Sequence, residues 1–130
     1  PPPNAGRPHA GDEEAYRRAL ASADRKYQAG NFAGAVADYR RALASKESST
    51  AQAGLGRALY DGNQPLAAQE ALLRAIEIDP RNARAWLTLG EIYVEQDRKG
   101  EARRAYLRYL EIEPSGPYAR DVRSVLQQLQ

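Results

Sequence analysis

Cysteine and methionine are absent from this chain of 130 residues, and it has one histidine, one tryptophan and one phenylalanine. Without cysteine there is no disulfide, no thiolate metal site and no cysteine nucleophile. The only histidine, His9, lies in a proline-rich stretch, so the histidine base of a Ser–His catalytic pair is missing from the rest of the chain. We therefore expect no bound metal, no cofactor and no catalytic residues.

Long apolar runs and a strong net charge are lacking too. No run approaches the roughly 18 residues of a transmembrane helix, and the first residues have no signal-peptide pattern. A formal net charge of +2 is too small to favour nucleic acid or an anionic membrane. We expect a cytoplasmic location. The abundant arginine, alanine and leucine indicate a bacterial source, and the missing initial methionine indicates a piece of a longer protein.

Residues 1–11, PPPNAGRPHAG, contain four of the eight prolines and have no helical or strand period. Such a stretch has little to bury, so it is predicted to be a disordered linker. A proline-rich ligand for another domain is the alternative. The folded domain is expected from residue 12, with Asp12 as the helix cap and the next two glutamates in the first turn.

The rest of the chain repeats itself every 34 residues. Pro80 and Pro114 close the similar stretches AIEIDP and YLEIEP, and Gly56 and Gly90 have the same spacing. An earlier copy lies 33 residues upstream, and its missing residue most simply falls in the loop at 45–49. A fixed period of this size is typical of a stack of identical structural units.

Each copy divides into two helices at turn-forming residues near 30–31, 62–63 and 97–100. The pattern predicts helices at 13–28, 32–45, 50–61, 65–78, 83–96, 100–112 and 117–129. No segment has a strand period over more than a few residues. In the last helix, one apolar stripe consists of Val122, Val125, Leu126 and Leu129. This stripe is expected to cover the open end of the array.

The repeat resembles the tetratricopeptide repeat (TPR) family. The third copy matches its W-x-x-L-G-x-x-Y…A…aromatic…P pattern with Trp86, Leu89, Gly90, Tyr93, Ala102, Tyr106 and Pro114. The second copy keeps Leu55, Gly56, Ala68, Leu72, Ala75 and Pro80, but has Gln52 for the tryptophan and Leu59 for the tyrosine. The first copy keeps Ala23, Ala35, Tyr39 and Ala42, and has Lys26 where an aromatic residue is usual. The resemblance covers about residues 15 to 116.

The resemblance implies an all-α solenoid in a domain spanning 12–130. Its three helix-turn-helix repeats are expected at about 16–48, 49–82 and 83–116, with a capping helix at 117–129. Gly56 and Gly90 are expected where paired helices approach closely, because no side chain fits there. The aromatic residues of the pattern are expected to fill the core.

The resemblance also implies a scaffold that binds a peptide or a partner domain in the concave groove lined by the first helix of each repeat. The candidate partner-binding residues are Arg17, Leu20, Asp24, Tyr27, Arg57, Tyr60, Asp61, Arg84, Leu87, Glu91, Val94 and Glu95. Gln28, Ala53 and Thr88 belong to the same faces. Tyrosine and arginine suit a protein interface. The alternatives are self-association as a homodimer through the capping helix, and regulation of a catalytic domain outside this chain.

Charged residues outside this set are interpreted as a solvated outer face, which includes Arg40, Arg41 and Arg74. Glu91 and Glu95 are four apart on one helix and are interpreted as solvated charges rather than an acid–base pair. One TPR subclass grips the carboxylate of acidic chaperone tails with lysine, asparagine and arginine. The matching positions here are Leu20, Asp24, Gly54, Arg84 and Thr88. Only Arg84 is suitable, so that function is not expected.

Overall fold

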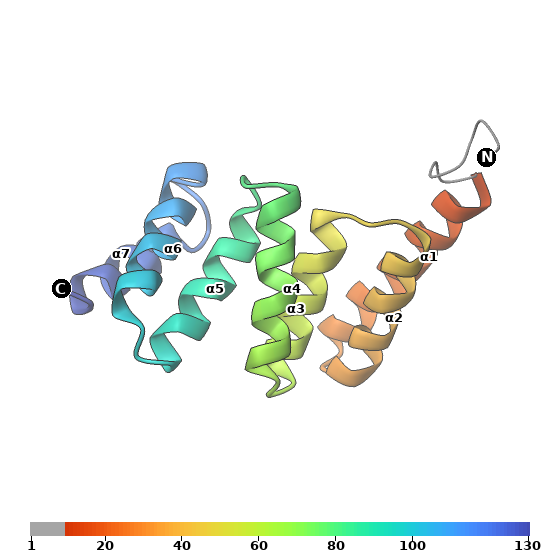
Figure 1. Ribbon diagram of the computed structural model, residues 1–130, viewed down its shortest axis with the longest axis horizontal. Helices are drawn as coiled ribbons and strands as arrows, with labels where there is room; N and C mark the ends of the chain where they lie inside the picture. Colours follow the sequence, from red (N-terminus) through yellow and green to blue (C-terminus); the bar gives the residue numbers. More distant parts are fainter. Residues whose placement is uncertain (1–9) are drawn as a thin grey trace.

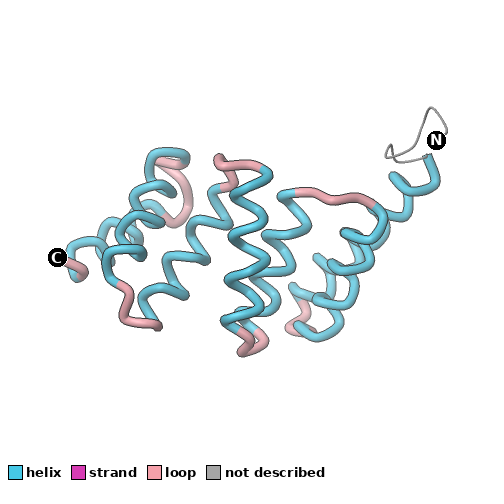
Figure 2. The backbone as a smooth tube through the Cα atoms, in the orientation of Figure 1, coloured by secondary structure: helices cyan, strands magenta, loops and turns pink. Residues whose placement is uncertain are grey.

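The computed structural model describes residues 10–130, and in this range the chain forms seven α-helices in a row and no strand (Figures 1 and 2). They are α1 (Ala10–Gln28), α2 (Phe32–Ser45), α3 (Ser49–Asp61), α4 (Pro65–Ile78), α5 (Ala83–Glu95), α6 (Lys99–Ile112) and α7 (Ala119–Gln128). The all-α solenoid inferred from the 34-residue period is confirmed.

The first and last helices, α1 and α7, begin at residues other than those predicted. Because α1 starts at Ala10, residues 10 and 11 are helical, and Asp12 lies in the first turn, where the helix dipole favours a carboxylate, rather than at the cap. The other residues of the expected linker, with His9, lie outside the described range. At the far end α7 begins at Ala119, because Pro117 and Tyr118 form the turn before it.

The same type of turn joins the two helices within each of the three pairs. Gly30, Asn63 and Asp97 each have a left-handed backbone, with φ of 80°, 65° and 57°. Glycine has no Cβ to clash in this conformation, and short polar side chains tolerate it. Between pairs, residues 46–48 connect α2 to α3, whereas the longer segment 79–82 connects α4 to α5. The shorter connection accounts for the 33-residue spacing.

The two glycines that recur at the 34-residue spacing, Gly56 and Gly90, lie where the paired helices touch. A Cβ on Gly90 would stand 2.6 Å from the Tyr106 ring, and one on Gly56 would stand 2.5 Å from the Leu72 side chain. Both distances are far too short for carbon atoms in contact, so the predicted close approaches are confirmed. Ala68, across from Gly56, has no exposed surface.

Each second helix packs against the first helix of the next repeat, as α2 does on α3 and α4 on α5. Successive first helices also contact one another, α1 with α3 and α3 with α5, whereas the described second helices make no such contact. Because stacked helix pairs curve, these contacts place α1, α3 and α5 on the inner side of the array and α2, α4 and α6 on the outer side. In Figure 1, α2 and α4 lie in front of α1 and α3. One continuous core joins the repeats. Val122 of α7 is 2% exposed, and the rest of its apolar stripe packs against that core, so α7 covers the end as predicted.

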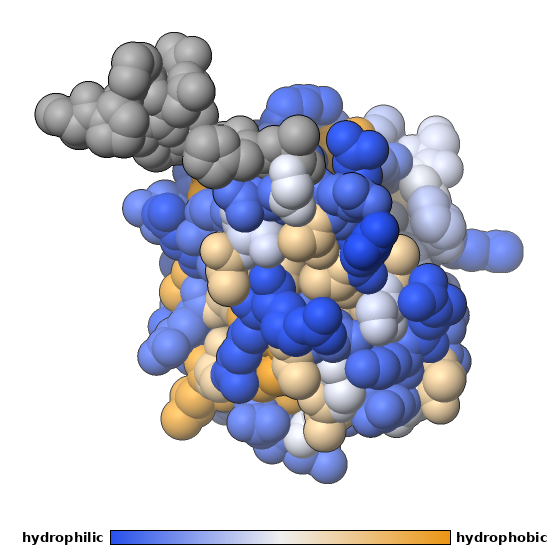
Figure 3. All heavy atoms as spheres, turned by 90° about the vertical axis from the view of Figure 1, so that its right-hand side faces the viewer, coloured by the Kyte–Doolittle hydropathy of each residue, from blue (hydrophilic) through white to orange (hydrophobic). Residues whose placement is uncertain are grey.

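The opposite end of the array, formed by α1 and α2, is covered mostly by hydrophilic residues with small apolar areas between them (Figure 3). A polar outer face is what a terminal repeat needs, because it has a neighbour on one side only. Among the helices that the structure describes, none is both long and apolar enough to cross a membrane.

Candidate functional site

Seven of the twelve candidate residues gather around one cleft of about 170 Å³ on the inner side of the array. They are Tyr27 of α1, Arg57, Tyr60 and Asp61 of α3, and Arg84, Leu87 and Glu91 of α5. The cleft also includes Thr88 and Tyr118. The stacking of α1, α3 and α5 therefore brings together side chains from three helices that are far apart in sequence.

Two further pockets continue this cleft. Glu95 joins Tyr60 and Asp61 in a pocket of about 480 Å³ at the C-terminal ends of α3 and α5. Asp24 joins Arg57 and Arg84 in a pocket of about 230 Å³ on the other side. The cleft shares Tyr60 and Asp61 with the first of these pockets and Arg57 and Arg84 with the second, and we call the three together the inner groove.

The remaining candidates have other surroundings. Leu20 packs against the core, and Leu87, which lines the cleft, is itself only 6% exposed, so both contribute to stability. Arg17 is exposed. Val94 is exposed near the end of α5. These positions share a helix face with the groove residues, but packing between repeats decides which side chains reach it.

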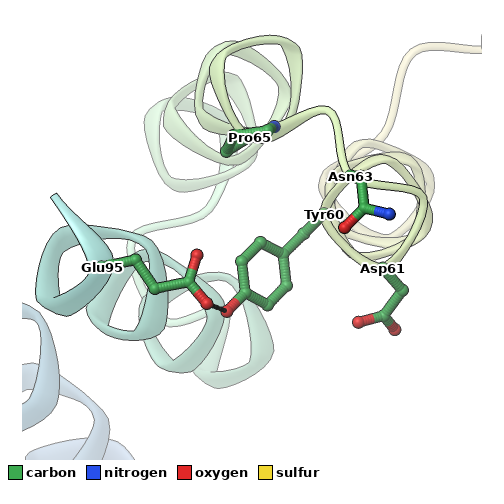
Figure 4. A pocket seen from close by; sticks show the side chains of 5 residues that line it. All are labelled: Tyr60, Asp61, Asn63, Pro65 and Glu95. Atoms are coloured by element: carbon green, nitrogen blue, oxygen red, sulfur yellow. Dashed lines mark hydrogen bonds between the residues drawn. The ribbon is translucent and has the colours of Figure 1, made fainter.

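Two tyrosines connect the successive first helices. The Tyr27 hydroxyl donates a hydrogen bond to Asp61 of the next repeat, and the Tyr60 hydroxyl donates one to Glu95 at 2.5 Å (Figure 4). Burial, followed by the hydrogen bond to Asp61, raises the pKa of Tyr27 to about 12. The pKa of Tyr60 is raised by burial and by Glu95. Both phenols therefore stay protonated and keep their donor role at neutral pH.

Arginine side chains stack on aromatic rings in the groove. The guanidinium carbon of Arg57 lies 4.0 Å from the ring centre of Tyr27, and that of Arg84 lies 5.5 Å from the ring centre of Tyr118. The Arg57 Nε atom is buried and has no hydrogen-bond partner. Within residues 10–130, neither arginine has a carboxylate oxygen within 4.0 Å. Their positive charges are thus not neutralised by a direct ion pair.

Glu91 departs from the expectation of a solvated charge, because it is half-buried in the cleft. Burial raises the pKa of its carboxyl group, as does the charge of Asp61, whereas Arg84 lowers it and Glu95 raises it. The groove thus contains an acidic group whose ionised form is disfavoured. Among the described residues, no three carboxylates or histidines are arranged to hold a metal ion.

Tyr118 is the residue of the 170 Å³ cleft that the sequence reasoning missed. It lies just before α7, and its backbone N–H donates to the Tyr109 hydroxyl at 3.2 Å. A usable signal exists, because Tyr118 follows Arg84 by one 34-residue period. Extending the repeat register into the capping segment would have placed Tyr118 beside the groove.

The arginines of the outer face are largely exposed, as expected, but several form local ion pairs. Arg74 lies 3.2 Å from Glu77, and Arg108 lies 2.6 Å from Glu111. Arg41 lies 2.9 Å from Asp38, whose side chain is buried. Replacing Arg41 would therefore disturb a buried carboxylate as well as the outer surface.

Comparison of sequences identifies one family. The sequence model described as tetratricopeptide repeat matches residues 20–65 and 53–117. No curated protein matches the chain.

Several solved structures have the same arrangement of helices. The TPR domain of Arabidopsis OM64 is 21% identical with a TM-score of 0.84, over 90% of this chain and 98% of that chain. The Yersinia enterocolitica type III secretion chaperone SycD, in complex with a peptide of the translocator YopD, is 17% identical with a TM-score of 0.81, over 89% and 92%. Pseudomonas aeruginosa pilF is 28% identical with a TM-score of 0.79, over 92% of this chain and 54% of that chain.

Proposed function

Because this chain belongs to the tetratricopeptide repeat family, we propose that it is a protein-interaction module that holds an extended segment of a partner protein in the inner groove. The observation that carries the proposal is the convergence of Tyr27, Arg57, Tyr60, Arg84 and Tyr118 on one cleft. Tyrosine and arginine are the side chains that most often dominate binding energy at the centre of an interface.

The organisation of the groove suits such a role. Its backbone belongs to helices held rigidly by the core, and the tyrosine hydrogen bonds tie one repeat to the next. Side chains that are ordered before binding lose less entropy when a ligand arrives. SycD, which shares the fold, has been solved with a bound peptide, and this likeness supports the proposal.

The partner that we propose is not an acidic chaperone tail gripped by its terminal carboxylate. Of the positions that would do this, Leu20 packs in the core and Asp24 carries a negative charge. Thr88 is 3% exposed and its hydroxyl donates to the Arg84 carbonyl at 3.1 Å. Arg84 alone has suitable chemistry, as the sequence indicated.

The proposal is tested with peptides selected on the wild-type domain from a random-peptide library displayed on phage. Replacing Arg57 and Tyr60 together with alanine should weaken binding of a selected peptide at least about tenfold, which corresponds to about 1.4 kcal/mol. The matched control replaces Arg40 and Arg104, both exposed on outer helices, with alanine. The control should bind within about twofold of wild type. If no peptide is selected, or if only the control loses binding, the proposed function is wrong.

Self-association is the second candidate function, and one observation favours it. Leu73 and Leu107 occupy the same position of successive repeats on the outer helices and are 41% and 45% exposed, and Leu66 is 72% exposed. Exposed leucines at matching positions can form a self-complementary contact. A monomer at tens of micromolar in light scattering would remove this alternative.

A further inference from the structure

Three charged residues on the inner face of α3 and α5 lie near helix ends where the helix dipole disfavours the sign of their charge. Arg84 lies in the first turn of α5, Glu95 is the last residue of α5, and Asp61 is the last residue of α3. A helix dipole favours acidic residues at the N-terminus and basic residues at the C-terminus. All three residues have the opposite placement, so they reduce the stability of the helices that carry them.

The first helix of the array has the favourable order. In α1 the first turn contains Asp12 and Glu13, and the last turn contains Arg25 and Lys26. None of these four residues lines the inner groove. Acidic residues also lie near the C-terminal ends of α4 and α6, at Glu77 and Glu111. Only on α3 and α5 do such charges line the inner groove, where a ligand could offset their cost.

The end of the groove near the N-terminus of α5 is basic. Arg57 and Arg84 both line the pocket of about 230 Å³, in which Asp24 is the only carboxylate. Asp24 accepts a hydrogen bond from the Tyr39 hydroxyl at 2.5 Å. Both guanidinium groups line this pocket, and among the described residues neither has a carboxylate oxygen within 4.0 Å, so they can donate to an acceptor from outside the chain.

The other end of the groove is acidic. Asp61 and Glu95 line the pocket of about 480 Å³ (Figure 4). Glu91 lines the adjoining cleft, together with Asp61 and Arg84. In the described part of the chain, no lysine or arginine nitrogen lies within 4.0 Å of these three carboxylates. The tyrosine hydroxyls supply hydrogen bonds but no positive charge.

The separation of the two ends suits a short extended segment. Arg84 and Glu95 are eleven residues apart on α5, which at about 1.5 Å per residue is about 16 Å. An extended chain covers this distance in about five residues. Opposite charges at that spacing in a ligand would each meet a charge of the other sign.

We infer that the inner groove binds a partner segment in one orientation, with an acidic side chain between Arg57 and Arg84 and a basic side chain against Asp61 and Glu95. The inference rests on the proposed function, and it adds the charge pattern and the direction of the bound segment. Complementary charges of this kind select partners and fix their register more than they add affinity. We infer an acidic side chain rather than a C-terminal carboxylate, because Leu20, Gly54 and Thr88 stand where the residues that grip a terminal carboxylate would be needed.

The test uses the same phage selection on the wild-type domain. Selected peptides should be enriched in an acidic and a basic residue about five positions apart and always in the same order, because the spacing follows from the helix rise and the extended chain. A synthetic selected peptide with its C-terminus amidated should keep its affinity within about twofold. The same peptide with the acidic and basic residues exchanged should bind at least about tenfold more weakly.

Variants of the domain separate the two ends. Arg57→Gln with Arg84→Gln should remove the preference for the acidic residue and leave that for the basic residue, and Asp61→Asn with Glu95→Gln should do the reverse. Arg40→Gln with Arg104→Gln is the matched control. If either groove variant fails to fold by circular dichroism, the exchanged peptide on the wild-type domain still decides the question.

The outcomes distinguish this inference from the proposed function. Selection of peptides without a fixed charge pair, equal binding of the exchanged peptide, or loss of binding on amidation would overturn the inference and leave the interaction module in place. In that case the reversed charges serve only the contacts between repeats. If the library yields no binding peptide at all, the proposed function fails first.

Discussion

The first and third repeats solve the same packing problem with different chemistry. Three matching core positions hold Ser22, Lys26 and Asp38 in the first repeat and Leu89, Tyr93 and Ala105 in the third. The second repeat resembles the third, with leucine, leucine and alanine. Three polar residues have thus replaced three apolar ones together, at positions that meet between the two helices of a pair.

The polar version is a network centred on a buried carboxylate. Asp38 is 2% exposed, and it accepts a hydrogen bond from the Ser22 hydroxyl at 2.5 Å. The ammonium group of Lys26 lies 2.8 Å from one of its oxygens, and Arg41 lies 2.9 Å from the other. This contact explains why Lys26 stands where the family has an aromatic residue.

Position in the array makes the polar network tolerable. The first repeat has a neighbour on one side only, and the side chain of Lys26 remains 42% exposed. Its charge is therefore partly solvated while it holds Asp38. The corresponding Tyr93 of the third repeat is 8% exposed and lies in the continuous core, where an unpaired charge would be costly. A family position can thus change character when its partners change with it.

The largest loss of stability is expected from a substitution in the third repeat, where the matching core positions are apolar. Leu89 has no exposed surface, so Leu89→Ala should leave a cavity and lower the free energy of unfolding by about 2–5 kcal/mol. The matching Ser22→Ala in the first repeat should cost only about 0.5–1.5 kcal/mol, because Lys26 and Arg41 still hold Asp38. Urea unfolding of both variants measures the difference. Equal losses would show that the two repeats do not differ as described.

Removing the centre of the polar network should cost less than the cavity does. Asp38→Ala leaves Ser22 and Lys26 without their partner, and we expect a loss of about 1–3 kcal/mol. The triple variant Ser22→Leu, Lys26→Leu, Asp38→Ala copies the second repeat and should lie within about 1 kcal/mol of wild type or above it. Glu70→Ala, at an exposed position of α4, is the control. A triple variant with a lower free energy of unfolding than Asp38→Ala would show that apolar packing cannot replace the polar network at these positions.

Acid should weaken the first repeat through Asp38. The hydrogen bonds from Lys26 and Ser22, then the charge of Lys26 and the bond from Arg41, hold the pKa of Asp38 below its ordinary value of 3.8, although burial opposes them. A lowered pKa contributes stability that is present above the unfolded value and is lost as pH falls through the folded value. Below about pH 4 the wild type should therefore lose unfolding free energy relative to the triple variant, which lacks Asp38. A difference that is independent of pH would remove Asp38 as its source.

Glu91 in the third repeat should behave in the opposite way, with the smallest effect. Burial and the charges of Asp61 and Glu95 raise its pKa above the ordinary 4.5, so its ionised form costs stability. That cost is absent below the unfolded pKa and appears as pH rises through the folded pKa. Glu91→Gln should stabilise the domain by about 0.2–0.5 kcal/mol at pH 7, as expected for relief of repulsion between like charges four residues apart. A thermal melt near pH 4 should show no gain.

The fold and much of the groove followed from local patterns in the sequence. The turns at Gly30, Asn63 and Asp97 and the close approach at Gly90 could be predicted because they depend on residues that every repeat must supply. Nine of the twelve residues that the helical register and the family resemblance predicted for the inner face line the inner groove. The buried network was not, because Ser22, Lys26 and Asp38 come from two helices and only their contact shows that the polar residues satisfy one another.

What the sequence by itself determined is the repeat, its helix pairs and the face of each first helix, since these follow from a fixed spacing of small, large and turn-forming residues. The tertiary structure decided which of those faces meet, and with them the chemistry of the groove. The stacking of Arg57 on Tyr27 and the arrival of Tyr118 beside Arg84 depend on how far one repeat rotates against the next. That rotation is the sum of many side-chain contacts in the core, so no single residue encodes it.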